Sequence, residues 1–235
     1  MSRSNSTSLP STFWTLIEVL RNPQLHKHLA ATINQNYSPQ SREYDVKRIT
    51  DTPLMQSLQA EIRRLRVSTV TTRTSEIDTV QLDEQWMLPK DITVLLFSQD
   101  ISLHRGLWAK ARPGSVSRPL SEFWAERFLI SNRAKSSLKS ERKQTKDNIE
   151  TGSFSMEALE PLDLVFDSVD HLGLGRDYLG AVQAATLAVF LTEFELQLCD
   201  PEAVDGAVPP VGEVAFGMGE PLEKVAVRIR QRKIG

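Results

Sequence analysis

The segment from Leu54 to Arg66 constrains the fold most strongly, because it has the pattern of an amphipathic helix that carries a charged pair. Its apolar side chains recur at helical spacing and form one stripe: Leu54, Leu58, Ile62 and Leu65. Glu61 and Arg64 are three residues apart, so both lie on the same side of the helix. An exposed ion pair of this kind contributes little stability, so its meaning depends on what the rest of the chain offers.

The segments on either side predict a mixture of helices and short strands. Two helices are expected within residues 12–33, with Asn22 ending the first and Pro23 opening the second. Residues 34–53 are expected to be a polar connection. Segments rich in β-branched and aromatic side chains predict strands at 67–74, 80–82 and 92–97.

Composition limits the class of protein. A length of 235 residues is enough for a single domain, which we expect to span residues 1–235. A net charge of −2 argues against a polyelectrolyte partner such as nucleic acid. The polar, basic stretch 131–153 has no aromatic residues among its charges before Phe154, so we expect a flexible loop there. The lone cysteine, Cys199, excludes an internal disulfide, and no apolar run is long enough to cross a membrane.

A second motif indicates what role the Glu61–Arg64 pair has in the fold. Further along the chain comes Trp124-Ala-Glu-Arg127-Phe, and a Glu-x-x-Arg helix followed by such a segment resembles the cytochrome P450 family. The resemblance implies that Glu61, Arg64 and Arg127 form a buried three-way ion-pair network. It also implies a mainly helical α+β fold with a small β-sheet, corresponding to the C-terminal half of the family's fold. In this resemblance residues 178–191 match a family helix, and residues 194–198 and 225–230 match its final strands. The stretch from Pro10 to Trp14 is similar to the prostacyclin synthase and sterol 7-alpha-hydroxylase branch, as found in fungal secondary metabolism.

The same resemblance carries expectations about what surrounds the chain. Residue 1 would correspond to a point more than halfway along a family member, so the N-terminal membrane anchor and most substrate-recognition loops would be absent. We therefore expect a cytoplasmic protein without a membrane anchor. Exposed apolar surface is expected on the first two helices, and a second chain could cover it. An apolar small molecule is the other expected partner.

The family's haem loop is degenerate in this sequence. Its signature is Phe-x-x-Gly-x-Arg-x-Cys-x-Gly, in which the cysteine thiolate ligates the iron. Phe166, Gly175 and Arg176 fit this pattern, whereas a valine replaces the first glycine and His171 replaces the arginine. Gly173 stands where the cysteine belongs. The chain keeps the usual length before and after the loop, which favours substitution in register over a frameshift.

Three consequences for haem follow from this loop. Cys199 lies about two dozen residues past the place of the missing thiolate, and we interpret it as a small buried or partly exposed side chain. His171 could ligate iron, although thiolate-type oxygen activation would then be lost. The lost glycines and the added loop carboxylates favour a third possibility, that no haem is bound, because a backbone that passes under a porphyrin needs glycine. We predict no cofactor and no metal site, with His171-ligated haem as the alternative.

Three functions remain open from the sequence. The first is a haem-free protein that acts in, or is left over from, a pathway making lipophilic natural products such as terpenoids or polyketides. The second is a non-redox enzyme of such a pathway that uses an apolar pocket for cyclisation, a pericyclic step or rearrangement. The third is a haem-dependent monooxygenase. Whether the protein is an enzyme at all is left undecided by the sequence.

Overall fold

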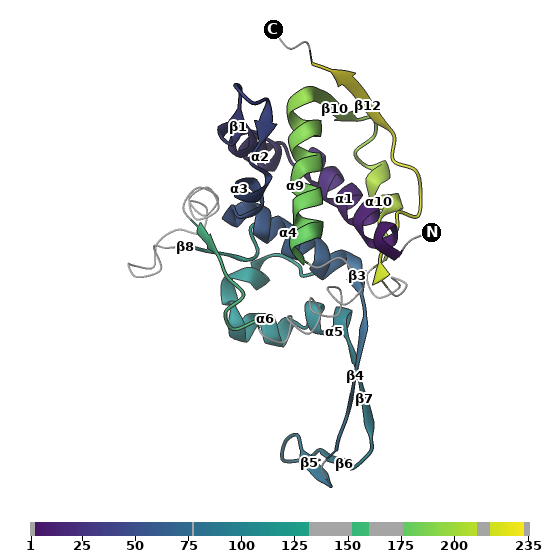
Figure 1. Ribbon diagram of the computed structural model, residues 1–235. Coiled ribbons are helices and arrows are strands. Elements are labelled where there is room, and N and C mark those ends of the chain that lie inside the picture. The colour runs from purple at the N-terminus through teal and green to yellow at the C-terminus, as the bar shows by residue number, and fades with distance from the viewer. Residues whose placement is uncertain (1–2, 77, 132–151, 160–175, 211–216, 233–235) are drawn as a thin grey trace.

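The computed structural model describes residues 3–76, 78–131, 152–159, 176–210 and 217–232. Four longer helices build the body (Figure 1): α1 (Arg3–Arg21), α2 (Pro23–Gln35), α4 (Pro53–Arg66) and α9 (Arg176–Glu193). Shorter helices join them: α3 (Val46–Thr50), α5 (Ser98–Leu103), α6 (Arg105–Ala111), the 3-10 turn η1 (Pro113–Ser117) and α10 (Ala203–Ala207). Helix α9 packs against α1, α2 and α3, so the two ends of the chain share one core.

The described strands form six antiparallel pairs. Around the body these are β1 (Tyr37–Ser38) with β2 (Glu43–Tyr44), β3 (Val67–Ser68) with β11 (Gly217–Met218), β8 (Leu129–Ser131) with β9 (Gly152–Phe154), and β10 (Phe194–Leu198) with β12 (Val227–Gln231). The other two pairs build a long ribbon that extends from the body: β4 (Val70–Thr74) with β7 (Thr93–Phe97), and β5 (Thr79–Gln81) with β6 (Met87–Pro89) (Figure 1). We call residues 70–97 the arm.

Local sequence explains where the helices begin. The Asn22 side chain accepts hydrogen bonds from the amides of Gln24 and Leu25 at 3.2 and 3.1 Å, and Pro23 occupies the first helical position. Both features are typical of a helix start, so the predicted break between α1 and α2 is confirmed. Asp45 caps α3 in the same way, accepting from the amide of Arg48 at 3.0 Å.

Helix α4 lies at the centre of the core. Its apolar residues Met55, Leu58 and Ile62 have no exposed surface and pack in one cluster with side chains from α1, α2 and α9. Helix α9 approaches α4 closely at Gly180, where a Cβ atom would lie 3.0 Å from Oε1 of Gln59. The side-chain amide of Gln59 donates from Nε2 to the Gly180 carbonyl at 3.0 Å. The absence of a side chain on Gly180 therefore permits this contact.

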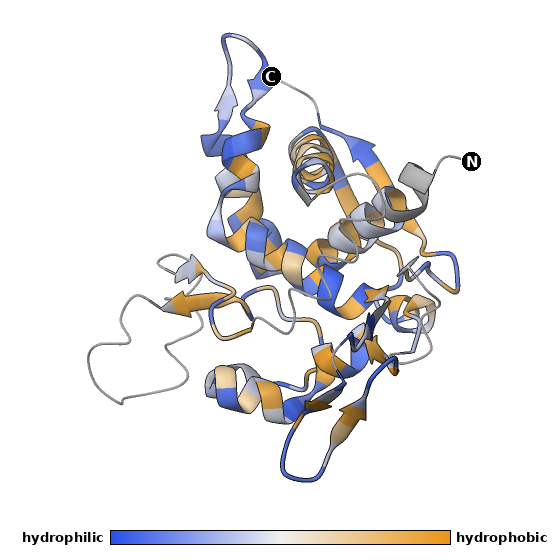
Figure 2. Cartoon of the chain, turned by 60° about the horizontal axis from the view of Figure 1, so that its bottom comes forward, coloured by the Kyte–Doolittle hydropathy of each residue, from blue (hydrophilic) through white to orange (hydrophobic). Residues whose placement is uncertain are grey.

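Two expectations from the sequence are wrong. Residues 34–53 are more than a polar connection, because they include the β1–β2 hairpin and α3, whose Ile49 is fully buried in the core. Among the side chains described on α1 and α2, Leu9 is the one large apolar residue that is exposed, because the others pack on α4 and α9. Half of the exposed large apolar residues lie on the arm, whose strands carry both hydrophobic and hydrophilic colours in Figure 2.

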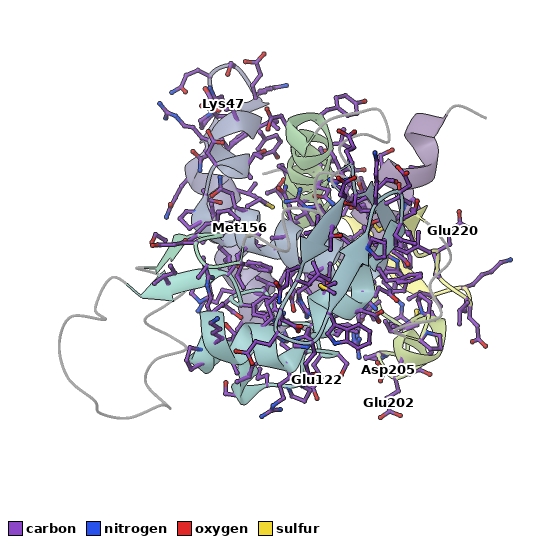
Figure 3. The ribbon with its side chains drawn as sticks, turned by 90° about the horizontal axis from the view of Figure 1, so that it is seen from below. Lys47, Glu122, Met156, Glu202, Asp205 and Glu220 are labelled. Carbon is purple, nitrogen blue, oxygen red and sulfur yellow. The ribbon has the colours of Figure 1, made fainter. Side chains whose placement is uncertain are left out.

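Charged side chains surround this core. Lys47, Glu202 and Asp205 lie at the periphery when the molecule is seen from below (Figure 3). Asp205 on α10 pairs with Arg21 at the end of α1, with 2.5 Å between Oδ1 and Nη2. Within the described ranges, no helix has both the length and the apolar character needed to cross a membrane.

Candidate functional site

The centre of the site is Glu61, which α4 directs toward the segment that contains Arg127. Arg64, one helical turn further along α4, donates from Nε to Oε2 of Glu61 at 2.7 Å and from Nη2 to Oε1 at 2.8 Å. Neither side chain has exposed surface. The pair is therefore a bidentate, fully desolvated ion pair, unlike the weak surface pairs that this spacing usually produces.

Arg127 completes a three-way network. Its Nε donates to Oε1 of Glu61 at 3.0 Å, and the amide of Trp124 donates to the same oxygen at 3.1 Å. The remaining donors of the guanidinium bind backbone carbonyls of Ser115 at 2.6 Å, Pro119 at 3.1 Å and Glu122 at 3.0 Å. The structure thus brings Glu61, Arg64 and Arg127 together, and Arg127 fastens η1 and the loop after it to α4.

Tryptophan side chains enclose the two arginines. The ring of Trp108 lies 5.7 Å from Cζ of Arg64 and 5.9 Å from Cζ of Arg127, distances that allow cation–π attraction. The indole of Trp108 donates to the carbonyl of Ser102 at 2.9 Å, and Arg64 donates to the same carbonyl at 3.3 Å. Trp108 therefore excludes water from the network while its own polar atom is satisfied.

The charges settle the protonation state of the network. Burial raises the pKa of Glu61, but the ion pairs and hydrogen bonds from Arg64 and Arg127 outweigh it, so the pKa lies below its ordinary value. Burial lowers the pKa of Arg127, and Glu61 opposes part of that effect. Arginine nevertheless remains protonated in proteins. The carboxylate therefore has no proton to give at neutral pH, and the network can fix the fold but cannot serve as an acid.

A second buried ion pair lies at the end of α4. Arg66 donates from Nη2 to Oε1 of Glu18 at 2.7 Å, and its Cζ lies 4.6 Å from the centre of the Trp14 ring. The indole of Trp14 donates to the carbonyl of Gly219 at 2.6 Å, and the amide of Gly219 donates to the carbonyl of Arg66. This pair was not predicted from the sequence. A signal was present, because a glutamate inside a helix that is apolar over most of its surface requires a cationic partner.

Ser57 provides a further link that was not predicted from the sequence. Its hydroxyl donates to the carbonyl of Ala125 at 2.5 Å and accepts from the amide of Phe128 at 3.2 Å. Arg73 is exposed on β4 of the arm, and its side chain donates to the carbonyl of Thr72. Nothing in the described structure brings Arg73 near the Glu61 network.

The residues predicted for the haem loop fall mostly outside the part of the chain that the structure describes. Phe166, His171, Gly173 and Gly175 lie outside the described residues, and Arg176 opens helix α9. Cys199 is exposed beyond the end of β10. The described part of the chain contains no group of three or more His, Cys, Asp or Glu side chains that could hold a metal ion.

Comparison with known proteins identifies the class. The family model for cytochrome P450 matches residues 4–141, more than half of the chain. The chain belongs to the cytochrome P450 family, whose members normally bind haem. The predicted mainly helical α+β fold of P450 type is confirmed, and a zebra fish cytochrome P450 solved with abiraterone has a TM-score of 0.55 over 98% of this chain and 45% of its own, at 19% identity. Another cytochrome P450 crystal structure has a TM-score of 0.56 over 97% of this chain and 43% of its own, at 15% identity.

Curated relatives give a closer relationship within the family. The cytochrome P450 monooxygenase fsoE of Humicola fuscoatra is 30% identical over 98% of this chain and 41% of its own length. The monooxygenase efuG of Hormonema carpetanum is 25% identical over 98% of this chain and 42% of its own length. The chain is therefore related to fungal P450 monooxygenases and spans about two fifths of the length of these two relatives.

Proposed function

We propose that this protein is a P450-fold protein without thiolate-haem monooxygenase activity, and that it acts in, or is left over from, a pathway making lipophilic natural products. The observation that carries the proposal is the position of Cys199, the one thiol in the sequence. P450 oxygen activation requires a thiolate on iron, and Gly173 occupies the place in the sequence where that cysteine belongs.

The surroundings of Cys199 do not fit a haem ligand. The residue follows β10, and its amide donates to the carbonyl of Ala226 at 3.0 Å, which continues the pairing between β10 and β12. Helix α9, 18 residues long, and then β10 separate it from Arg176, where the haem loop ends. The side chain is exposed, and the described residues place no metal-binding group beside it. We derive no haem chemistry from this thiol.

The ion network around Glu61 supports a scaffold rather than a catalytic role. Glu61, Arg64 and Arg127 are buried, mutually neutralised and fastened to backbone carbonyls. Their presence accounts for the P450 fold without requiring turnover. The relatives are named as fungal P450 monooxygenases, and the assignment to a natural-product pathway rests on that relationship.

Absorption spectroscopy tests the proposal. The purified protein is titrated with hemin, reduced with dithionite and exposed to carbon monoxide, and we expect no band beyond that of free hemin. Gly173→Cys is the matched variant, because it restores the thiolate at the family position. A thiolate-type reduced–CO band in the unaltered protein would overturn the proposal. A histidine-type band that disappears in His171→Ala would assign His171 as an iron ligand instead.

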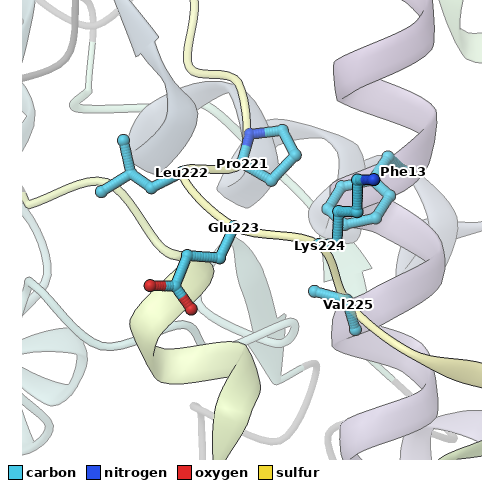
Figure 4. Close-up of a pocket in the computed structure, with 6 residues that line it drawn as sticks. All are labelled: Phe13, Pro221, Leu222, Glu223, Lys224 and Val225. Atoms are coloured by element: carbon cyan, nitrogen blue, oxygen red, sulfur yellow. The ribbon is translucent and has the colours of Figure 1, made fainter.

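A non-redox step on an apolar intermediate is the second candidate, favoured by one pocket. A surface pocket of about 470 Å³ lies between α1 and the segment 221–225, and most of its wall is apolar: Phe13, Pro221, Leu222 and Val225 (Figure 4). Glu223 and Lys224 add opposite charges to the wall. A rise in melting temperature with terpenoid or polyketide ligands, lost in Phe13→Ala, would support this candidate. An unchanged melting temperature with every such ligand would count against it.

A further inference from the structure

The arm is the part of the molecule whose apolar side chains lack cover. Of the twelve large hydrophobic residues that are exposed among the described ones, six lie within the arm: Leu82, Trp86, Met87, Ile92, Leu95 and Phe97. Among the described residues, each of its two strand pairs is a separate sheet of two strands, and the arm extends away from the helical body (Figure 1). A two-stranded ribbon is marginally stable in water by itself. These features indicate that the arm is a surface for binding another polypeptide.

Strand β7 offers an unprotected edge. Its residues Thr93-Val-Leu-Leu-Phe97 include no charge and no proline, the devices by which soluble proteins usually block an edge strand. Strand β4 carries Arg73, so its edge is partly protected. Among the described residues, β7 pairs with β4 alone. The open edge of β7 is therefore where we expect a further strand to add.

The hydrogen-bond pattern shows which groups of β7 are free to bind. The amide of Ser98 donates to Thr69, and Ile92 accepts from the amide of Ser75, so residues 92 and 98 face β4. Because orientation alternates along an antiparallel pair, Thr93, Leu95 and Phe97 direct their amides and carbonyls to the open edge. Leu95 and Phe97 also place half-exposed side chains on the same face as Thr72 and Val70.

This edge is complementary to itself. A two-fold axis at Leu95 would set Leu95 opposite Leu95 of a second copy, and Thr93 opposite Phe97. All three positions then form reciprocal hydrogen-bonded pairs, and no charge meets a like charge. The four apolar side chains of Leu95 and Phe97 from the two copies would line one continuous face.

Charge favours a second copy over an unrelated strand. Residues 75–92, which include the tip of the arm, contain five acidic side chains and one lysine. Residues 98–118, at the base of the arm, contain four basic side chains and one acidic one. Antiparallel pairing of two arms points each acidic tip toward the basic base of the other copy. Arg105 and Lys110 are exposed there, so they can meet Asp83 and Glu84 of the tip.

We propose that the arm is a dimerisation surface, on which the β7 edges of two copies join into a four-stranded antiparallel sheet in the order β4–β7–β7–β4. The acidic tip of each arm contacts the basic α5–α6 region of the other copy. This inference does not depend on the proposed function, because it rests on the arm alone.

Sedimentation equilibrium of the full chain tests the proposal. We expect a mass twice the 26.5 kDa of one chain, and a dissociation constant that rises with salt because the tip contacts are exposed ion pairs. Leu95→Lys places two like charges across the axis and should weaken the dimer by roughly tenfold or more. Leu222→Lys is the matched control, since Leu222 is similarly exposed but lies outside the arm, and it should leave the dimer intact.

Two further measurements identify the surface. Hydrogen exchange should show protection of the Thr93, Leu95 and Phe97 amides that is lost in Leu95→Lys. The double variant Asp83→Lys/Glu84→Lys and the double variant Arg105→Glu/Lys110→Glu should each dimerise poorly, yet form a mixed dimer with one another. A monomer at every concentration, a dimer unaffected by Leu95→Lys, or edge amides that exchange freely would overturn the proposal.

Discussion

Two buried glutamates pair with arginines of the same helix, yet their environments move their pKa values in opposite directions. Glu61 accepts hydrogen bonds from Arg64, Arg127 and the amide of Trp124, and its pKa lies below the ordinary value. Glu18 accepts one described hydrogen bond, from Arg66. Burial raises the pKa of Glu18, and the attraction of Arg66 and Arg21 does not fully offset it.

The difference shows what a buried carboxylate requires. Glu61 has no exposed side-chain surface and Glu18 has 4%, so the desolvation of the two is similar. The number of cations and donors around each therefore decides whether its pKa rises or falls. Removing a charge from water costs several kcal/mol, and one hydrogen-bonded arginine is less able than two to offset that cost. We expect Glu61 to stabilise the fold strongly and Glu18 to do so weakly.

The largest effect should come from Glu61→Gln. The glutamine would leave Arg64 and Arg127 as uncompensated buried cations, and breaking a buried pair in this way typically costs about 3–5 kcal/mol. Urea unfolding followed by tryptophan fluorescence measures the loss. Glu122→Gln is the control, because Glu122 is exposed and contributes its backbone carbonyl, not its side chain, to Arg127. Equal stability of Glu61→Gln and the unaltered protein would contradict the strong role assigned to Glu61.

The first of these networks was predicted from the sequence. The second was not, because the position of Glu18 inside an apolar helix indicates that a cation is needed but not which residue supplies it. Glu61 and Arg64 are one helical turn apart, and the Trp124-Ala-Glu-Arg127-Phe segment supplied the third member through family resemblance. Helix positions were predictable for the same reason, since Asn22 and Pro23 act locally on α2. Helical spacing and helix capping depend on residues that are close in the sequence, so both can be predicted from it.

Glu18 and Arg66 come together only because α1 and α4 cross in the folded molecule. They are separated by 48 residues, and neither belongs to a motif. The same limit explains why α3 was missed, since five residues with one buried isoleucine carry too little periodicity to predict a helix. Nor could the sequence show that the apolar strand β7 would remain uncovered, because exposure depends on what packs beside it.

Glu18→Gln should cost less than half as much as Glu61→Gln. The neutral amide can still accept from Arg66, whose charge also rests against the Trp14 ring, and the desolvation that raises the Glu18 pKa disappears. We expect a loss of about 1.5 kcal/mol, at the lower end of the range for a single hydrogen bond to a charged group. Parallel urea titrations of the two variants give the ratio. A larger loss for Glu18→Gln would reverse the order that the donor count predicts.

Trp14→Phe isolates the support around the second pair. It removes the indole donor to the Gly219 carbonyl and reduces the cation–π contact with Arg66. The unsatisfied buried carbonyl should cost about 1–3 kcal/mol, toward the lower end because phenylalanine keeps most of the packing. Trp86→Phe makes the same chemical change on the exposed arm and should leave the unfolding midpoint unchanged. A similar loss in both variants would mean that the effect does not arise at the Gly219 contact.

The smallest effect is the pH dependence, and its sign separates the two glutamates. Because the folded pKa of Glu61 lies below its ordinary value of 4.5, the unfolded chain binds more protons in the interval between, and stability falls as the pH drops through it. Glu18 behaves in the opposite way, since its folded pKa is raised above 4.5 and stability falls as the pH rises from 4.5 through that higher value. A tenfold difference in proton affinity between the folded and unfolded chains corresponds to about 1.4 kcal/mol. The free energy of unfolding is measured across both pH intervals. In Glu61→Gln it should no longer fall as the pH drops below 4.5, and in Glu18→Gln it should no longer fall as the pH rises above 4.5. If both variants lost the same one of these two slopes, one network would control both carboxylates.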